Sequence, residues 1–203
     1  AISTISVQNI VDRCQAGNQT LCDLITRVNG AITTIDNPYL NLQSLKTDGL
    51  DIELSYRRPI GAGTATARFL ANRIFSYAIS DGVTSIDRAG DIVNAQPEWT
   101  GNATIGYQLG KLNAFTDINY IGSGKYDVTF VLPTDINDNH IPSRTIVNFQ
   151  LSYDVGQDGR RREFFVNMSN AFDVRPPAIF VYSGGPNYER AGRSFRVGLR
   201  FSL

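Results

Sequence analysis

The end of the chain alternates apolar and polar residues without a break. From Phe195 to Leu203 every second residue is apolar, and the residues between them are polar or glycine and include Arg196 and Arg200. A period of two predicts an extended strand, because successive side chains of a strand point to opposite faces. One face is then wholly apolar, and the other carries two cations. Such a strand suits a wall between hydrocarbon and water, as in a transmembrane β-barrel, although a buried strand of a β-sandwich has a similar pattern.

The same alternation recurs along most of the chain. Within the segment that ends at Val155, for example, Phe149 and Leu151 share one face, and Asn148 and Gln150 share the other. Similar patterns predict seven strands, at residues 39–57, 64–80, 97–110, 111–125, 143–155, 162–172 and 192–203.

The connections between these strands alternate in length. The short ones are 59–63, 110–111 and 156–160, and the long ones are roughly 81–96, 126–142 and 173–191. Outer-membrane barrels have short periplasmic turns and long extracellular loops, whereas β-sandwiches seldom keep this rhythm. The polar faces also carry too many charges for a dry core. The sequence therefore predicts an all-β fold, an antiparallel transmembrane β-barrel with meander topology.

Composition excludes several other classes. Lys plus Arg and Asp plus Glu number 19 each, so the chain has no net charge to attract nucleic acid. No run of 18 apolar residues is present, which excludes a transmembrane helix. Helix is expected only within residues 7–30, where apolar residues fall three to four positions apart. The chain has no linker and no signal peptide, so we expect one structural unit that is a mature form or an excised piece.

The two cysteines and the single histidine limit the chemistry. Cys14 and Cys22 lie eight positions apart, which predicts one local disulfide in an oxidising compartment, with two free thiols as the alternative. His140 is far from both and has no nucleophile motif nearby. Residues 135–146 match a calcium loop at only three positions, so a solvated turn is the better interpretation. We therefore expect no catalytic residue, no metal and no cofactor, and a protein that is not an enzyme.

Several segments resemble TonB-dependent outer-membrane receptors. The resemblance rests on residues 41–57, 97–99, 167–177 and 192–203, together with the loop between Cys14 and Cys22. The first has a Gly ahead of an acidic alternating stretch, and the last two are similar to the penultimate and closing strands of these receptors. Leu203 departs from the family, whose members typically end in an aromatic residue.

The resemblance implies that residues 1–203 are the C-terminal part of a 22-stranded receptor barrel, without its plug domain. Such a receptor lies in the bacterial outer membrane and imports a scarce nutrient of the ferric siderophore or oligosaccharide type. Its partners are the rest of the barrel, the plug domain, outer-membrane lipid, a small-molecule ligand and, through the missing N-terminal part, TonB. Two alternatives are a small self-contained barrel for adhesion or structure and a secreted carbohydrate-binding β-sandwich.

The last long loop is the candidate ligand contact. It mixes aromatic and charged side chains, which suits sugars or aromatic chelates. The residues that we expect to contact the ligand are Arg175, Tyr182, Tyr188 and Arg190. Packing of the loop on its neighbours is the alternative, and the two tyrosines also suit an interfacial aromatic girdle.

Overall fold

The computed structural model describes residues 4, 6–39, 44–80, 84–156, 162–177 and 191–201. It divides the chain into two compact units instead of the single unit that the sequence predicts. Unit 1 comprises residues 1–46 and 78–87, and unit 2 comprises 47–77 and 88–203.

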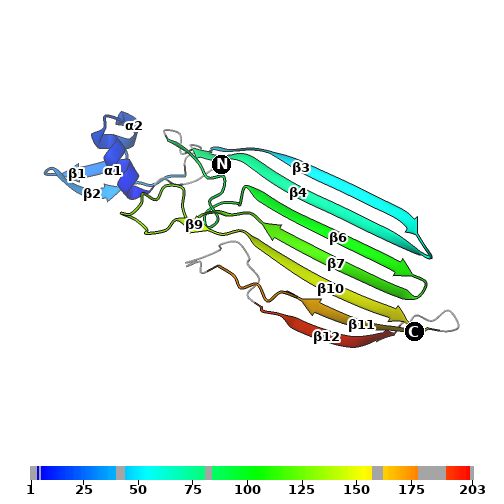
Figure 1. Ribbon diagram of the computed structural model, residues 1–203. Coiled ribbons are helices and arrows are strands. Elements are labelled where there is room, and N and C mark those ends of the chain that lie inside the picture. Colours follow the sequence, from blue (N-terminus) through cyan, green and yellow to red (C-terminus); the bar gives the residue numbers. More distant parts are fainter. Residues whose placement is uncertain are drawn as a thin grey trace. The chain divides into compact units, whose positions relative to one another are not determined.

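An antiparallel sheet of seven longer strands and one short strand makes up most of unit 2 (Figure 1). Its longer strands follow the chain order and are β3 (Ser44–Ile60), β4 (Gly63–Ser80), β6 (Trp99–Leu109), β7 (Leu112–Ile121), β10 (Arg144–Asp154), β11 (Arg162–Ser169) and β12 (Ser194–Phe201). A short strand, β5 (Ser85–Asp87), pairs with the end of β4. The seven predicted strands and the meander topology are confirmed.

The connections differ between the two ends of the sheet, as predicted. Two-residue turns join β3 to β4 and β6 to β7, and Gly61 (φ +61°) and Gly110 (φ +56°) supply the left-handed conformation that they need. At the other end, the long connection after β7 contains the paired strands β8 (Gly124–Lys125) and β9 (His140–Ile141).

The strand register divides the side chains into two faces, which we call the polar face and the apolar face. The polar face includes Asp51, Glu53, Arg68, Asn72, Asn102, Asp117, Asn148, Gln150, Asn167 and Arg196. The apolar face includes Leu54, Phe69, Ile105, Phe149, Leu151, Phe164, Val197 and Leu199. The alternation in the sequence therefore matches the two faces of the sheet.

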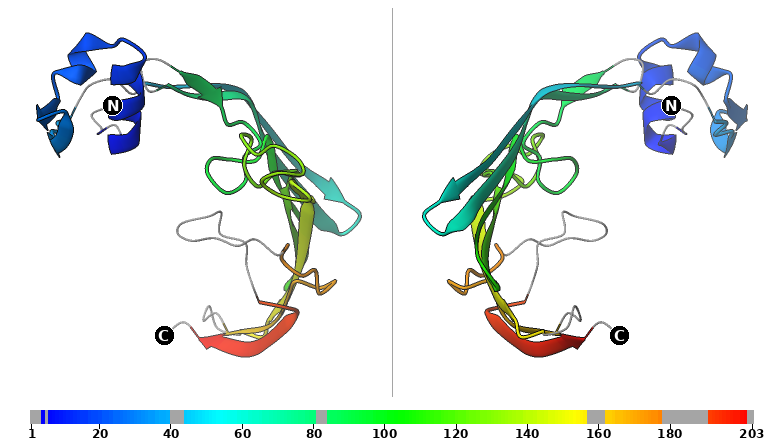
Figure 2. Two further views of the ribbon diagram at one scale, coloured as in Figure 1. Left: turned by 90° about the vertical axis from the view of Figure 1, so that its left-hand side faces the viewer. Right: turned by 90° about the vertical axis from the view of Figure 1, so that its right-hand side faces the viewer.

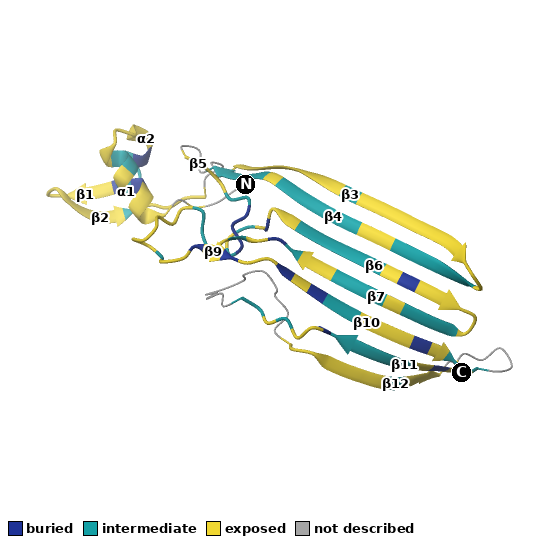
Figure 3. Cartoon of the chain, in the orientation of Figure 1, coloured by how far each residue is buried: buried dark blue, intermediate teal, exposed yellow. Residues whose placement is uncertain are grey.

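The apolar face is open. Leu54 is 63% exposed, Leu151 47% and Val197 62%, and exposed positions run along the strands in Figure 3. The strands of unit 2 form a curved wall (Figure 2). Side chains on the convex side of any curved sheet point away from one another and are more exposed than those on the concave side. We therefore assign the apolar face to the convex side. Within the described residues, no second sheet covers it, which is contrary to a β-sandwich.

Two phenylalanines on the polar face fill the space above glycines on neighbouring strands. A Cβ at Gly106 would lie 2.6 Å from the Phe115 ring, and a Cβ at Gly198 would lie 2.6 Å from the Phe165 ring. This arrangement explains the Phe164-Phe165 pair, which obscures the alternation in the sequence. Phe164 belongs to the apolar face, and Phe165 covers Gly198.

Adding a methyl group at Gly106 should therefore destabilise the sheet. We expect Gly106→Ala to lower the free energy of unfolding by about 1–3 kcal/mol, because the added Cβ overlaps Phe115. Gly101→Ala on the same strand is the control, since its Cβ would lie 3.5 Å from the nearest atom, the Leu70 carbonyl oxygen. Urea unfolding of the membrane-assembled protein measures the difference. Equal losses in the two variants would contradict this packing.

Unit 1 contains a small disulfide-bonded module. Its elements are α1 (Val7–Gln15), α2 (Gln19–Cys22), β1 (Ile25–Val28) and β2 (Ala31–Ile35). Ile10, Leu21 and Ile25 form its core, and Cys14 is bonded to Cys22 beside them. The expected helix is wrong beyond residue 22, where Asn29 and Gly30 turn the chain into a hairpin with positive φ at both positions.

Removing the disulfide should loosen this module. The bond closes a loop across eight positions, so Cys14→Ser with Cys22→Ser should cost about 2–3 kcal/mol of local stability. Hydrogen exchange of residues 7–35 should speed up accordingly, while exchange in β6 and β7 stays unchanged. Unchanged exchange in residues 7–35 would show that the core alone holds the module.

Candidate functional site

Asp117 is the centre of a hydrogen-bond network on the polar face. Its carboxylate accepts hydrogen bonds from Asn102 at 2.8 Å on β6 and from Asn148 at 3.3 Å on β10. Asn119, on the same strand as Asp117, also donates to it, and Thr104 lies 3.5 Å away. Three strands are thus linked through one carboxylate on the polar side of the sheet.

Further along the sheet, β3 and β4 carry paired polar side chains. Arg68 donates to Glu53 through Nε at 3.1 Å and through a terminal nitrogen at 2.9 Å, and Asn72 donates to Asp51 at 2.6 Å. Arg68 and Glu53 are both more than half exposed, so solvent screens their attraction and the pair adds little stability. The opposite charges of Arg68 and Glu53 cancel. This part of the polar face is therefore hydrated but has no strong electrostatic field of one sign.

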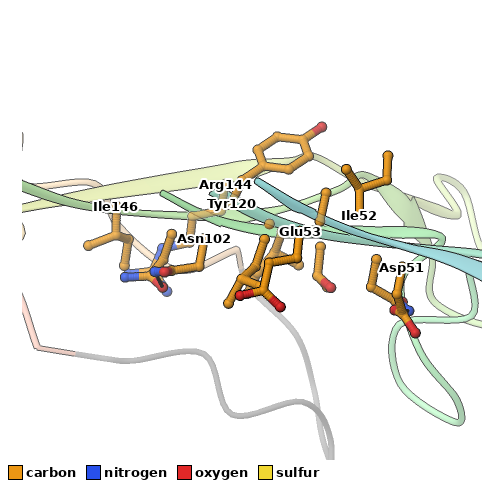
Figure 4. Close-up of a pocket in the computed structure, with 14 residues that line it drawn as sticks. Asp51, Ile52, Glu53, Asn102, Tyr120, Arg144 and Ile146 are labelled. Carbon is orange, nitrogen blue, oxygen red and sulfur yellow. Dashed lines mark hydrogen bonds between the residues drawn. The ribbon is translucent and has the colours of Figure 1, made fainter. Parts of the chain in front are cut away.

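A hollow of about 650 Å³ lies over these strands (Figure 4). Asp51, Glu53 and Asn102 point to one side of the ribbon, whereas Ile52 and Tyr120 point to the other. The hollow thus offers carboxylates and amides, together with the guanidinium of Arg144. Such groups bind sugar hydroxyls or amide-rich ligands through hydrogen bonds.

The base of the expected ligand loop is anchored to this hollow. Arg144, which is buried and lines the hollow, donates to the Val174 carbonyl at 3.2 Å. Asn170 is buried with a φ of +49°, and its carboxamide both donates to and accepts from the Val174 backbone. Arg175 follows directly and is exposed. The other three expected contacts, Tyr182, Tyr188 and Arg190, lie outside the described residues.

The loops after β5 and β7 are fastened together by polar side chains that sequence reasoning did not single out. Arg88 donates to Asp91 at 2.6 Å and to Asp127 at 3.3 Å, and Asn94 donates to Asp127 at 2.9 Å. Asp91 is fully buried. Asn139 accepts hydrogen bonds from the Tyr126 and Asp127 amides. We call these five residues, Arg88, Asp91, Asn94, Asp127 and Asn139, the loop knot.

The loop knot accounts for part of the segment that resembles a calcium loop. Asn139, one of the three matching positions, is buried, and its carboxamide donates a hydrogen bond to the Asp127 carbonyl instead of facing a cation. Within the described part of the chain, no three His, Cys, Asp or Glu side chains gather closely enough to hold a metal ion. None of the helices described is long and apolar enough to cross a bilayer.

Comparison with known proteins agrees with this geometry. The family described as TonB dependent receptor-like, beta-barrel, matches residues 10–171. The chain belongs to this receptor barrel family. Neither curated proteins nor solved structures gave a match to the sequence. Receptors of this family are outer-membrane transporters, so the resemblance seen in the strand motifs is confirmed.

In this receptor barrel, the loop knot contains a carboxyl group with a shifted pKa. Burial raises the pKa of Asp127, but hydrogen bonds from Thr129 and the adjacent Arg88 guanidinium outweigh burial and hold the pKa below its usual 3.8. The Thr129 amide and hydroxyl donate to Asp127 at 2.8 and 2.6 Å. The ionised form of Asp127 is therefore the one that the folded loops favour.

Acid should release the loop knot. The pKa of Asp127 is lower in the folded protein than in the unfolded chain. The ionised carboxylate therefore stabilises the folded loops fully well above pH 3.8, and this stabilisation is lost as the pH falls through the lower pKa of the folded state. Hydrogen exchange in residues 122–143, corrected for intrinsic rates, should therefore rise steeply below about pH 4. Asp127→Asn should raise exchange at pH 6 and abolish the steep rise. Asp138→Asn, at an exposed loop position, is the control, and the same change there would contradict the assignment to Asp127.

Proposed function

We propose that this chain is the C-terminal part of an outer-membrane receptor that imports a scarce nutrient, of the ferric siderophore or oligosaccharide type. One observation carries the proposal: the same strands expose large apolar side chains on one face and a hydrogen-bonded polar network on the other. The family match supports transport as the general activity.

A bilayer explains the open apolar face. Full burial of a large apolar side chain contributes about 1.5–3 kcal/mol, and side chains such as Leu199 and Phe201, which are more than half exposed, forgo much of this in water, whereas hydrocarbon removes the penalty. Strands β6, β7 and β10 contain 11, 10 and 11 residues, close to the 9–11 residues of a tilted membrane-spanning strand. Trp99 and Tyr107, near the two ends of β6 on the apolar face, suit the two aromatic girdles.

The sheet needs further strands, which favours a larger barrel over a small self-contained one. β3 and β12 lie at opposite edges of the described sheet and do not pair with each other. Their free edges suit the remaining strands of the receptor barrel. The polar face suits a plug domain, and TonB would act through the plug domain of such a receptor. In this arrangement the short turns face the periplasm and the long loops face outward.

We assign ligand contact to Arg175, Tyr182, Tyr188 and Arg190 in the last long loop. The support is positional: the start of this loop is held by Arg144 and Asn170 beside the polar hollow. A ligand that contacts the loop is then placed above the carboxylates and amides of the polar face.

The proposal predicts energised uptake that depends on this loop. In the producing bacterium, the protein should fractionate with the outer membrane, and its deletion should slow growth on a limiting iron chelate or oligosaccharide. A proton uncoupler should abolish uptake of that nutrient.

Arg175→Ala should lower the uptake rate several-fold at an unchanged protein level, because a cationic ligand contact is lost. Arg162→Ala, at the far end of the sheet, is the control and should leave the uptake rate unchanged. A soluble location, or uptake that is indifferent to the uncoupler, would overturn the proposal.

A further inference from the structure

A second hollow lies where the apolar face meets the loops, and it has mixed chemistry. Its volume is about 330 Å³. Trp99 and Tyr120 border it from the ends of β6 and β7, and Lys125 and His140 border it from the paired strands β8 and β9. Glu98 adds a carboxylate. We call this hollow the rim notch.

Arg73 lies beside the rim notch on the apolar face. The register pairs it with Trp99, and its guanidinium carbon lies 5.1 Å from the centre of the Trp99 ring and 5.0 Å from that of Phe75. Its Nε is buried and has no hydrogen-bond partner among the described residues. Aromatic rings therefore hold this cation in place of a carboxylate.

The neighbouring arginine on β4 shows what is unusual about Arg73. Arg68 lies on the polar face and is neutralised by Glu53 at 2.9 Å. Arg73 lies on the face that we assign to lipid, where a cation is tolerated only near the headgroups. The anion that this face can meet is a lipid phosphate. Lys125, which is exposed and lines the rim notch together with Trp99, adds a second positive charge.

We propose that Arg73 and the rim notch bind the phosphorylated sugar headgroup of an outer-leaflet glycolipid. Arg73 and Lys125 contact phosphate, and the rings of Trp99 and Tyr120 pack against the sugar. Glu98 accepts hydrogen bonds from sugar hydroxyls; because its charge repels a bare anion, the site favours a phosphosugar over inorganic phosphate. This inference rests on the proposed function for the membrane and for its orientation.

Lipid binding by the full-length receptor tests the proposal. The receptor is delipidated and placed in phosphatidylcholine nanodiscs with a glucosamine-disaccharide lipid that carries two phosphates, and bound lipid is counted by native mass spectrometry. Arg73→Gln and Lys125→Gln should each weaken binding about fivefold, and the double variant about 25-fold, as expected for charges that act near a membrane surface.

Two arginines serve as matched controls. Arg68→Gln removes a cation from the same strand but the opposite face, and Arg162→Gln removes one from the same face at the other end of the sheet. Both variants should bind the phosphorylated lipid as the unaltered receptor does. Arg73→Lys retains the charge and should bind more tightly than Arg73→Gln. If Arg73→Gln does not assemble, the fivefold loss expected for Lys125→Gln still decides the outcome.

Three results would overturn the site. These are equal binding of the dephosphorylated lipid, equal loss in Arg162→Gln, and competition by inorganic phosphate as effective as by the phosphorylated headgroup. Fractionation and uptake measure the proposed function separately. If the receptor imports its nutrient but fails the lipid assay, only the lipid site is wrong. If it binds the lipid but imports no nutrient, only the transport assignment is wrong.

Discussion

Each strand of the sheet must suit two solvents at the same time, and the rest of the structure depends on that requirement. A strand presents successive side chains to opposite sides, so an apolar medium on one side and water on the other demand strict alternation. β12 meets the demand, with Phe195, Val197, Leu199 and Phe201 exposed on the apolar face. Backbone hydrogen bonds between neighbouring strands satisfy the main chain, which hydrocarbon would otherwise leave without partners.

On the polar face, stability and hydration come from side-chain networks instead of apolar burial. Asp117 links β6, β7 and β10 through amide donors, and Glu163 on β11 accepts a hydrogen bond from Arg200 on β12 at 3.0 Å. The two glycine–phenylalanine contacts add packing where a larger residue would collide. This face therefore combines order with groups that remain able to bind water or a ligand.

The features with functional potential lie at the loop end of the sheet. There the loop knot joins two long connections, Arg144 fixes the start of a third, and Arg73 stacks between rings near the lipid boundary. The strands position these loops at one end of the sheet. At this end Arg144 lines the hollow on the polar face, whereas Arg73 and the rim notch lie on the apolar face.

Local pattern predicts much of this protein, because alternation and turn residues act over a few positions. The seven strands and the meander follow from the period of two and from the rhythm of short and long connections. The same local signal in Asn29-Gly30 indicates the hairpin of unit 1, which the helical spacing of apolar residues in 7–30 obscured.

The candidate sites depend on contacts that no local pattern encodes. Arg88 meets Asp127 from 39 positions away, and Arg144 reaches Val174 from 30 positions away. Phe164 and Phe165 look alike in the sequence, and only the strand register places one toward lipid and the other over Gly198. The sequence by itself determined the two-faced strands and their order, since each depends on neighbours along the chain. Tertiary structure alone decided which loop side chains meet and that the Arg73 guanidinium lies against aromatic rings, because those contacts depend on how distant strands align.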